Sequence, residues 1–175
     1  MQLRMKDSPV QEVKKTAQLI RQITRNTATR FIVNDFLDVA IDTGADGVHL
    51  GQDDVDITVA RRKWKAKGKM YGLSTHNERQ AGAAEEISPD YIGVGPIFST
   101  PTKAVPDPVV GLERMENIIR SSSFPAVAIG GINGKNLVDV LSHEAKNFCA
   151  VRPVMQSAEP EKVIGGLMEI WKAMV

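Results

Sequence analysis

The feature of this sequence that most constrains its fold is the alternation of short apolar segments with longer amphipathic segments. Gly47–Leu50, Tyr91–Val94 and Ala126–Ile129 are apolar at nearly every position rather than at every second position. Strands of this kind are typical of parallel sheets that are buried on both faces. The alternation therefore predicts an α/β protein made of repeated βα units, either a (β/α)8 barrel or an open, doubly wound sheet.

The pattern predicts a βα repeat along the whole chain. Strands are expected at 2–6, 30–33, 47–50, 70–73, 91–94, 126–129 and 148–151. Helices are expected around 13–23, 37–41, 57–65, 78–87, 112–119, 137–141 and 163–171, where apolar residues recur at helical spacing. This gives about seven βα units, roughly one fewer than a complete barrel. The length predicts a single domain, residues 1–175.

Composition excludes several classes of function. The 22 basic and 21 acidic residues give a net charge of +1, and only 5% of residues are aromatic, so we expect no nucleic-acid partner. No apolar run approaches the length of a membrane span, and no secretory signal is visible at the N-terminus. A single cysteine, Cys149, excludes an intrachain disulfide and a CxxC metal site. We therefore expect a cytoplasmic protein that does not contact a membrane.

Polar residues and glycines cluster where the expected strands end. In parallel α/β folds, the carboxyl ends of the strands carry the functional site. The residues at these ends include Arg4, Lys6, Asn34, Asp35, Asp54, Ser74, Gly130, Gly131 and Arg152. The irregular stretch Pro96–Pro108 holds four prolines and adds Thr100, Thr102 and Lys103. A loop of that length in a compact domain is usually functional.

Each of these residues has a functional and a structural interpretation. Glycines such as Gly130 and Gly131 let backbone amides approach a phosphate at a helix N-terminus, or they serve a tight turn with positive φ. Asp35 and Asp54 suit Mg²⁺, or they cap the helices that follow them. Basic residues at strand ends fit a diphosphate, or they are ordinary solvated charges. The threonine hydroxyls of the irregular stretch bind a ligand or cap the loop.

The histidines give weaker signals. His49 lies within an apolar strand and is expected to line the core, whereas His76 is expected near a helix N-terminus. No nucleophile and base stand at the spacing of a catalytic triad, so covalent acyl transfer is disfavoured.

The motifs together carry a family resemblance. They are QLRMK at 2–6, ND at 34–35, GADGVHLGQDD at 44–54, GLSTH at 72–76, DYIGVGPIFSTPTK at 90–103 and AIGGIN at 128–133. In this order and spacing they resemble the thiamin phosphate synthase family, over essentially the whole chain. The resemblance implies a TIM-type (β/α)8 barrel, here with about seven βα units.

The resemblance also implies an activity and a set of site residues. The family is a transferase in thiamin biosynthesis: it joins a pyrimidine diphosphate to a thiazole phosphate and releases pyrophosphate. Contacts to the pyrimidine diphosphate are implied for Gln2, Arg4, Lys6, Asn34, Ser74 and Lys103. Asp35 and Asp54 would hold Mg²⁺, and Thr100, Thr102 and Gly131 would bind the thiazole phosphate. The expected partners are therefore small-molecule substrates.

The sequence departs from the family pattern at two places. The strand and helix that normally precede the QLREK-like motif are not seen before Met1, which matches the count of seven units. A missing strand leaves unpaired edges, so association into a homo-oligomer is among the expectations. At the last strand end, Val151 and Arg152 replace a small hydroxyl residue, and Arg152 either strengthens phosphate binding or fills the pocket. The alternatives are a thiazole tautomerase, with His76 as acid and base, and a non-catalytic phosphate-binding paralogue.

Overall fold

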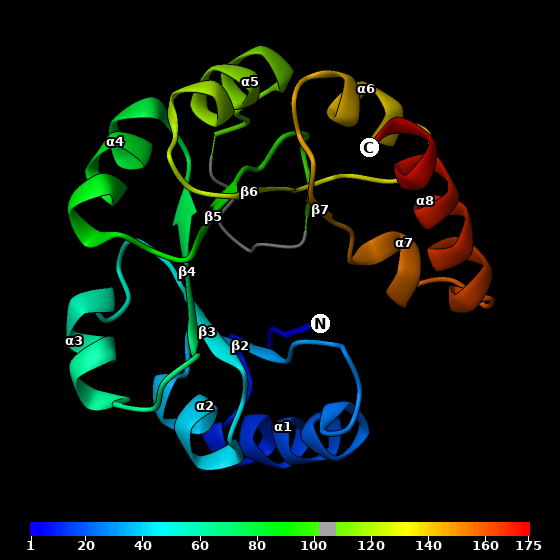
Figure 1. The fold of residues 1–175 in the computed structure, drawn as a ribbon. Helices are drawn as coiled ribbons and strands as arrows, with labels where there is room; N and C mark the ends of the chain where they lie inside the picture. Colours follow the sequence, from blue (N-terminus) through cyan, green and yellow to red (C-terminus); the bar gives the residue numbers. More distant parts are fainter. Residues whose placement is uncertain (102–107) are drawn as a thin grey trace. The chain divides into compact units, whose positions relative to one another are not determined.

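Strands and helices alternate along the chain in the predicted order, as the computed structural model shows for residues 1–101 and 108–175 (Figure 1). The strands are β1 (Gln2–Leu3), β2 (Ile32–Asn34), β3 (Gly47–Leu50), β4 (Met70–Thr75), β5 (Tyr91–Val94), β6 (Ala126–Ile129) and β7 (Phe148–Cys149). The helices are α1 (Val10–Thr24), α2 (Leu37–Thr43), α3 (Ile57–Lys63), α4 (Glu78–Ile87), α5 (Leu112–Ser121), α6 (Leu137–Ser142), α7 (Arg152–Met155) and α8 (Pro160–Met174).

Contacts divide the chain into two compact units. Unit 1 comprises residues 1–74 and 89–91, and unit 2 comprises residues 75–88 and 92–175. The expectation of a single domain over residues 1–175 stays a prediction. No helix in the described ranges is long and apolar enough to cross a bilayer.

Unit 1 is built on parallel strands in the order β1-β2-β3-β4. Val33 of β2 pairs with Val48 of β3, which pairs in turn with Tyr71 of β4. Val33 and Val48 are fully buried, as expected for strands covered on both faces. Helix α1 buries Val13 and Ala17 and packs along α2, which covers β2 and β3 (Figure 1). Apolar residues on one face of each helix thus form the core with the strands.

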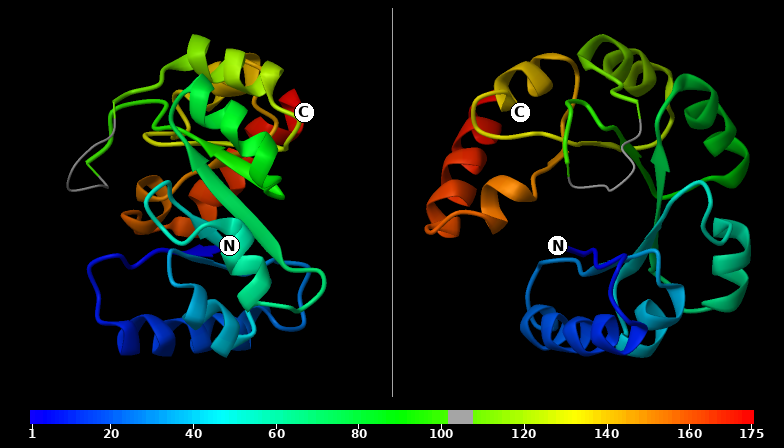
Figure 2. Two further views of the ribbon diagram at one scale, coloured as in Figure 1. Left: turned by 90° about the vertical axis from the view of Figure 1, so that its left-hand side faces the viewer. Right: turned by 180° about the vertical axis from the view of Figure 1, so that it is seen from behind.

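Unit 2 repeats the arrangement with the strand order β5-β6-β7. Ala128 of β6 pairs with Val94 on one side and with Phe148 on the other. Met115 and Ile118 of α5 are fully buried, which explains the helical spacing of their apolar residues. Helix α8 lies against α6 and α7, as the right-hand view of Figure 2 shows.

Several element boundaries differ from the predicted ones. Strand β1 ends at Leu3 rather than at residue 6, and β2 runs from Ile32 to Asn34 rather than over residues 30–33. Strand β4 continues through Thr75, so Ser74 lies within the strand rather than after it. Strand β7 ends at Cys149 rather than at residue 151, and it is followed by the short helix α7, for which the sequence carries no helical period. Pro153 stands in the first turn of α7, where proline favours a helix start.

Candidate functional site

Two carboxylates and a lysine converge in unit 1 at the end of β2. The Lys6 ammonium lies 3.1 Å from Oδ2 of Asp35, and the Asp54 carboxyl adjoins that of Asp35. Burial raises the pKa of Asp35 and the Asp54 carboxyl raises it further, while Lys6 opposes both effects. Two carboxylates held this close repel each other, so the cluster favours an added cation.

The backbone at Asp35 is held in an uncommon conformation. Asp35 has a φ of +66°, in the left-handed region that side chains other than glycine rarely adopt. Its amide donates to the carbonyl of His49 at 2.9 Å, and the Phe36 amide donates to the carbonyl of Asn34 at 2.9 Å. Strain of this kind costs on the order of 1 kcal/mol and clusters at functional sites.

Neither carboxylate caps the helix that follows it. The N-cap of α2 is Phe36, and the N-cap of α3 is Asp56, whose side chain accepts from the Thr58 amide at 2.7 Å. Asp54 instead accepts from the Gly51 amide at 2.6 Å, which holds it in the turn that follows β3. The helix-capping interpretation of Asp35 and Asp54 is therefore wrong.

Asn34 carries a buried donor that has no partner in the described residues. It is the last residue of β2, is 7% exposed, and its Nδ2 atom makes no hydrogen bond there. A buried amide without a partner is costly, because it has lost its hydration without replacement. Its position next to Asp35 makes it a candidate donor to a ligand.

The remaining predicted residues of unit 1 lie on β1 and β4. Gln2 is exposed on β1, and Arg4 is half-buried just after that strand. Ser74 is half-buried on β4, and its hydroxyl lies 2.9 Å from Nε2 of His49. The structure thus brings Lys6, Asp35 and Asp54 into contact, whereas Ser74 is linked to His49.

His49 has a larger role in this network than the sequence indicated. It is buried as predicted, with 8% of its surface exposed, but it also bonds through Nδ1 to the hydroxyl of Tyr91 at 3.1 Å. Burial lowers the pKa of His49 to about 4. The signal available in the sequence was a histidine within an otherwise apolar strand, but nothing there named Tyr91 as its partner.

In unit 2, Gly130 and Gly131 form a turn directly after β6. Their φ angles are +99° and +69°, as the tight-turn interpretation requires. A Cβ on Gly131 would lie 2.7 Å from Cβ of Phe98, and the Asn133 and Asn136 side chains donate to the Gly131 carbonyl at 3.1 and 3.0 Å. Helix α6 begins at Leu137, as the helical spacing predicted, so residues 132–136 separate this turn from the helix N-terminus.

The other predicted residues of unit 2 are more scattered. Thr100 is half-buried in the irregular stretch, and Thr102 and Lys103 lie outside the described residues. Val151 and Arg152 are exposed and begin α7, rather than ending a strand. His76 directly precedes Asn77, the N-cap of α4, as predicted. Its Nδ1 atom lies 2.5 Å from the carbonyl oxygen of Gly95.

Comparison with known proteins adds to this geometry. A family model described as thiamine monophosphate synthase matches residues 1–154. The chain belongs to the thiamine monophosphate synthase family. It is 43% identical over 171 residues to a thiamine-phosphate synthase of Pelotomaculum thermopropionicum, covering 97% of this chain and 78% of the relative. It is 42% identical over 157 residues to that of Persephonella marina, covering 89% and 74%.

Solved structures agree with the family assignment. A thiamine phosphate pyrophosphorylase from Pyrococcus furiosus superposes with a TM-score of 0.88 and 34% identity, covering 99% of this chain and 83% of that one. A 3-hexulose-6-phosphate synthase superposes with a TM-score of 0.72 at 14% identity, covering 91% of this chain and 81% of that one, a likeness of fold alone. The predicted fold class, a TIM-type barrel fold with about seven βα units here, is confirmed. So is the predicted activity, that of a thiamine-phosphate synthase, a transferase.

Proposed function

We propose that residues of unit 1 bind a pyrimidine diphosphate, that residues of unit 2 bind a thiazole phosphate, and that the enzyme joins the two with release of pyrophosphate. The observation that carries the proposal is the cluster of Lys6, Asp35 and Asp54, next to the unpartnered amide of Asn34. A cation and a free donor stabilise the anionic diphosphate, and the carboxylate pair suits the Mg²⁺ that accompanies such a substrate.

Asp35 and Asp54 fit Mg²⁺ as its protein ligands. Both offer carboxylate oxygens, and burial and Asp54 raise the pKa of Asp35, so a cation there relieves the repulsion. The described residues contain no group of three or more histidine, cysteine or acidic side chains that could cage a metal. Mg²⁺ commonly takes one or two carboxylates and completes its shell with water and substrate phosphates. When bound, it would neutralise charge on the diphosphate oxygens.

Several residues of unit 1 each contribute an interaction that favours release of the diphosphate. The bond between the pyrimidine methylene carbon and the diphosphate oxygen breaks, and the thiazole nitrogen forms a new bond to that carbon. Lys6 and Arg4 stabilise the negative charge that grows on the leaving group, and Asn34 donates to it. Ser74 adds a hydroxyl donor, and Gln2 is assigned to the same substrate from the family pattern. Lys103 is assigned to this substrate from the family pattern as well, but it lies outside unit 1 and outside the described residues. The reaction needs no protein nucleophile, because the thiazole supplies one.

The residues of unit 2 are assigned to the thiazole phosphate. The turn at Gly130 and Gly131 presents backbone without side chains, so a phosphate can approach it closely. Thr100 and Thr102 offer hydroxyls, and Arg152 next to Val151 offers a guanidinium, which suits phosphate. We also infer a cytoplasmic location, since both substrates are small phosphorylated molecules, and a homo-oligomer stays a prediction.

Turnover with an Asp35 variant tests the unit 1 assignment. The purified chain is mixed with both substrates and Mg²⁺, and thiamin phosphate is measured. Asp35→Asn should lower the rate by at least about 100-fold, the scale of losing one electrostatic group. Asp42→Asn is the matched control, because Asp42 is an exposed carboxylate on α2 that pairs with Lys14. A rate unchanged in Asp35→Asn would refute the assignment, and a folded chain without product would favour the non-catalytic paralogue.

A glycine pair tests the unit 2 assignment separately. Gly131→Ala places a Cβ within 2.7 Å of Phe98 at a positive φ, so it should raise KM for the thiazole phosphate. KM for the pyrimidine diphosphate should stay unchanged. Gly134→Ala, where nothing lies within 4 Å of the added Cβ, serves as the control. Equal changes in both KM values for Gly131→Ala would contradict the assignment.

A further inference from the structure

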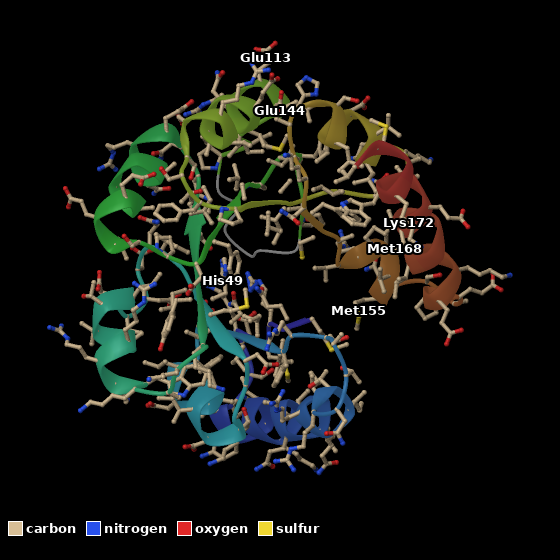
Figure 3. All side chains as sticks on the ribbon, viewed as in Figure 1. His49, Glu113, Glu144, Met155, Met168 and Lys172 are labelled. Carbon is tan, nitrogen blue, oxygen red and sulfur yellow. The ribbon has the colours of Figure 1, made fainter. Side chains whose placement is uncertain are left out.

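Three polar side chains of unit 1, those of Tyr91, His49 and Ser74, are hydrogen-bonded in series. Only Ser74 has a role in the function proposed above. His49 on β3 bonds through Nε2 to the Ser74 hydroxyl at 2.9 Å and through Nδ1 to the Tyr91 hydroxyl at 3.1 Å. His49, labelled in Figure 3, is buried, and its ring is tilted by 33° to that of Tyr91 with the centroids 5.4 Å apart. Both ring nitrogens are therefore engaged, and the imidazole links a tyrosine to the serine.

Gly72 leaves the room that this contact occupies. It pairs with His49 in the register of β3 and β4. A Cβ at Gly72 would lie 2.3 Å from Cζ of Tyr91, 2.4 Å from Nδ1 of His49 and 2.5 Å from the Tyr91 hydroxyl. Since Gly72 does not have a positive φ, the glycine is needed here for space. The backbone of β4 is thus shaped to let Tyr91 reach His49.

The chemistry of the three groups decides the direction of the hydrogen bonds. A neutral imidazole has one donor nitrogen and one acceptor nitrogen, and burial favours the neutral ring. A phenol is much more acidic than an aliphatic hydroxyl, so Tyr91 is the better donor and its proton lies toward Nδ1. Nε2 then carries the ring hydrogen, and this N–H group donates a hydrogen bond to the Ser74 oxygen. The Ser74 hydroxyl hydrogen is left to bond elsewhere.

We propose that Tyr91 and His49 are positioning residues that orient the Ser74 hydroxyl as a hydrogen-bond donor to the bound diphosphate. The proposal rests on the function assigned to unit 1 and adds the direction of the serine donor. We call the hydrogen-bonded series Tyr91–His49–Ser74 the relay. No proton is transferred along it, and no covalent bond is made or broken in it. Its contribution is preorganisation, because a hydroxyl that already donates to histidine cannot also donate to an anion.

The tautomer of His49 tests the first half of the proposal without any substrate. Nitrogen NMR on ¹⁵N-histidine-labelled chain should show Nε2 protonated and Nδ1 unprotonated at neutral pH, with the His49 signals assigned through His49→Gln. Tyr91→Phe should abolish this preference, because it removes the donor to Nδ1. Tyr71→Phe is the matched control: Tyr71 is the chain's other tyrosine, and its hydroxyl donates to the Trp64 carbonyl. A wild-type ring protonated on Nδ1 overturns the proposal.

Binding of inorganic pyrophosphate with Mg²⁺, measured by calorimetry, tests the second half. Tyr91→Phe should weaken the affinity about three- to tenfold, the range for one hydrogen bond, and Tyr71→Phe should not. In a Ser74→Ala background, Tyr91→Phe should have no further effect. If Tyr91→Phe weakened pyrophosphate binding equally in the Ser74→Ala background, Tyr91 would act through packing rather than through Ser74. Absence of pyrophosphate binding by the wild-type chain would also overturn the donor role.

The two proposals fail in different ways. A chain that makes thiamin phosphate, but in which the Tyr91→Phe effect persists without Ser74, refutes the relay alone. A chain that makes no thiamin phosphate, yet keeps the Nε2 tautomer and Ser74-dependent pyrophosphate affinity, refutes the catalytic proposal alone.

Discussion

Acid should destabilise the chain through His49. Burial is the main cause that lowers the pKa of His49 from 6.5 to about 4; Asp54 opposes this shift, and Lys6 and Arg4 add to it. The unfolded chain, whose histidine is in water, therefore takes up a proton that the folded chain resists. Between pH 6.5 and about 4 the unfolded state binds more protons, so the free energy of unfolding falls as the pH falls.

The size of the effect follows from the same two pKa values. A change from 6.5 to about 4 corresponds, at about 1.4 kcal/mol per pKa unit, to about 3 kcal/mol. The stabilisation is fully present above pH 6.5 and is lost as the pH approaches about 4. Since small domains are stable by only about 5–15 kcal/mol, a loss of this size moves the unfolding midpoint measurably. Asp35 has the opposite effect. Because its pKa is raised in the folded chain, its contribution to the free energy of unfolding increases as the pH falls.

Urea denaturation from pH 7 to pH 4, followed by circular dichroism, measures how the free energy of unfolding changes with pH. The comparison is with His49→Gln, which keeps the carboxyl groups and removes only the imidazole titration. The wild-type chain should lose about 3 kcal/mol more than the variant across this range. NMR titration of His49 should show no protonation near pH 6. Equal slopes for the two chains, or a His49 that titrates near 6.5, would refute the reasoning.

Three further predictions concern stability. Gly47→Ala should cost about 1–3 kcal/mol in urea denaturation, because the new Cβ would lie 2.3 Å from the Met70 carbonyl oxygen, whereas Gly82→Ala, on an exposed face of α4 with nothing within 4 Å, should stabilise the chain slightly. Met115→Ala should cost about 2–5 kcal/mol in the same assay, since Met115 is fully buried. Asp56→Ala should cost about 1 kcal/mol in thermal denaturation through loss of the α3 N-cap, and an unchanged midpoint would contradict the capping geometry.

The order of the elements could be predicted from the sequence because most elements carry a local signal, either a helical period or a short apolar run. Apolar positions three and four residues apart mark α5, and a continuous apolar run marks β6. The four-residue helix α7 carries no such signal, and the apolar run at 148–151 does not show where the two-residue strand β7 ends. The end of β7 is set by the pairing of Phe148 and Cys149 with β6, and α7 is a single short turn that begins at Arg152, so neither boundary was predicted.

The site was predictable only in part, for a related reason. The end of β2 and the turn after β3 were expected to bring Asp35 and Asp54 together, and they do. The choice between Asp54 and Asp56 as the cap of α3 depends on backbone geometry that two nearby aspartates do not reveal. The contact between His49 and Tyr91 joins positions 42 residues apart and depends on the register of intervening strands. No local pattern in the sequence encodes that register.

The register of unit 1 explains why a core and a polar network can share the same short strands. Asn34 pairs with His49, and His49 pairs with Gly72, so these three residues form one row across β2, β3 and β4. Because successive side chains of a strand point to opposite faces, this row lies on the face opposite to Val48. A slip of one residue between β3 and β4 would move the polar face into the core and the core into the polar face. The burial of Val48 therefore fixes the register that also places His49 over Gly72, and the same packing that stabilises unit 1 positions the hydroxyl of Ser74.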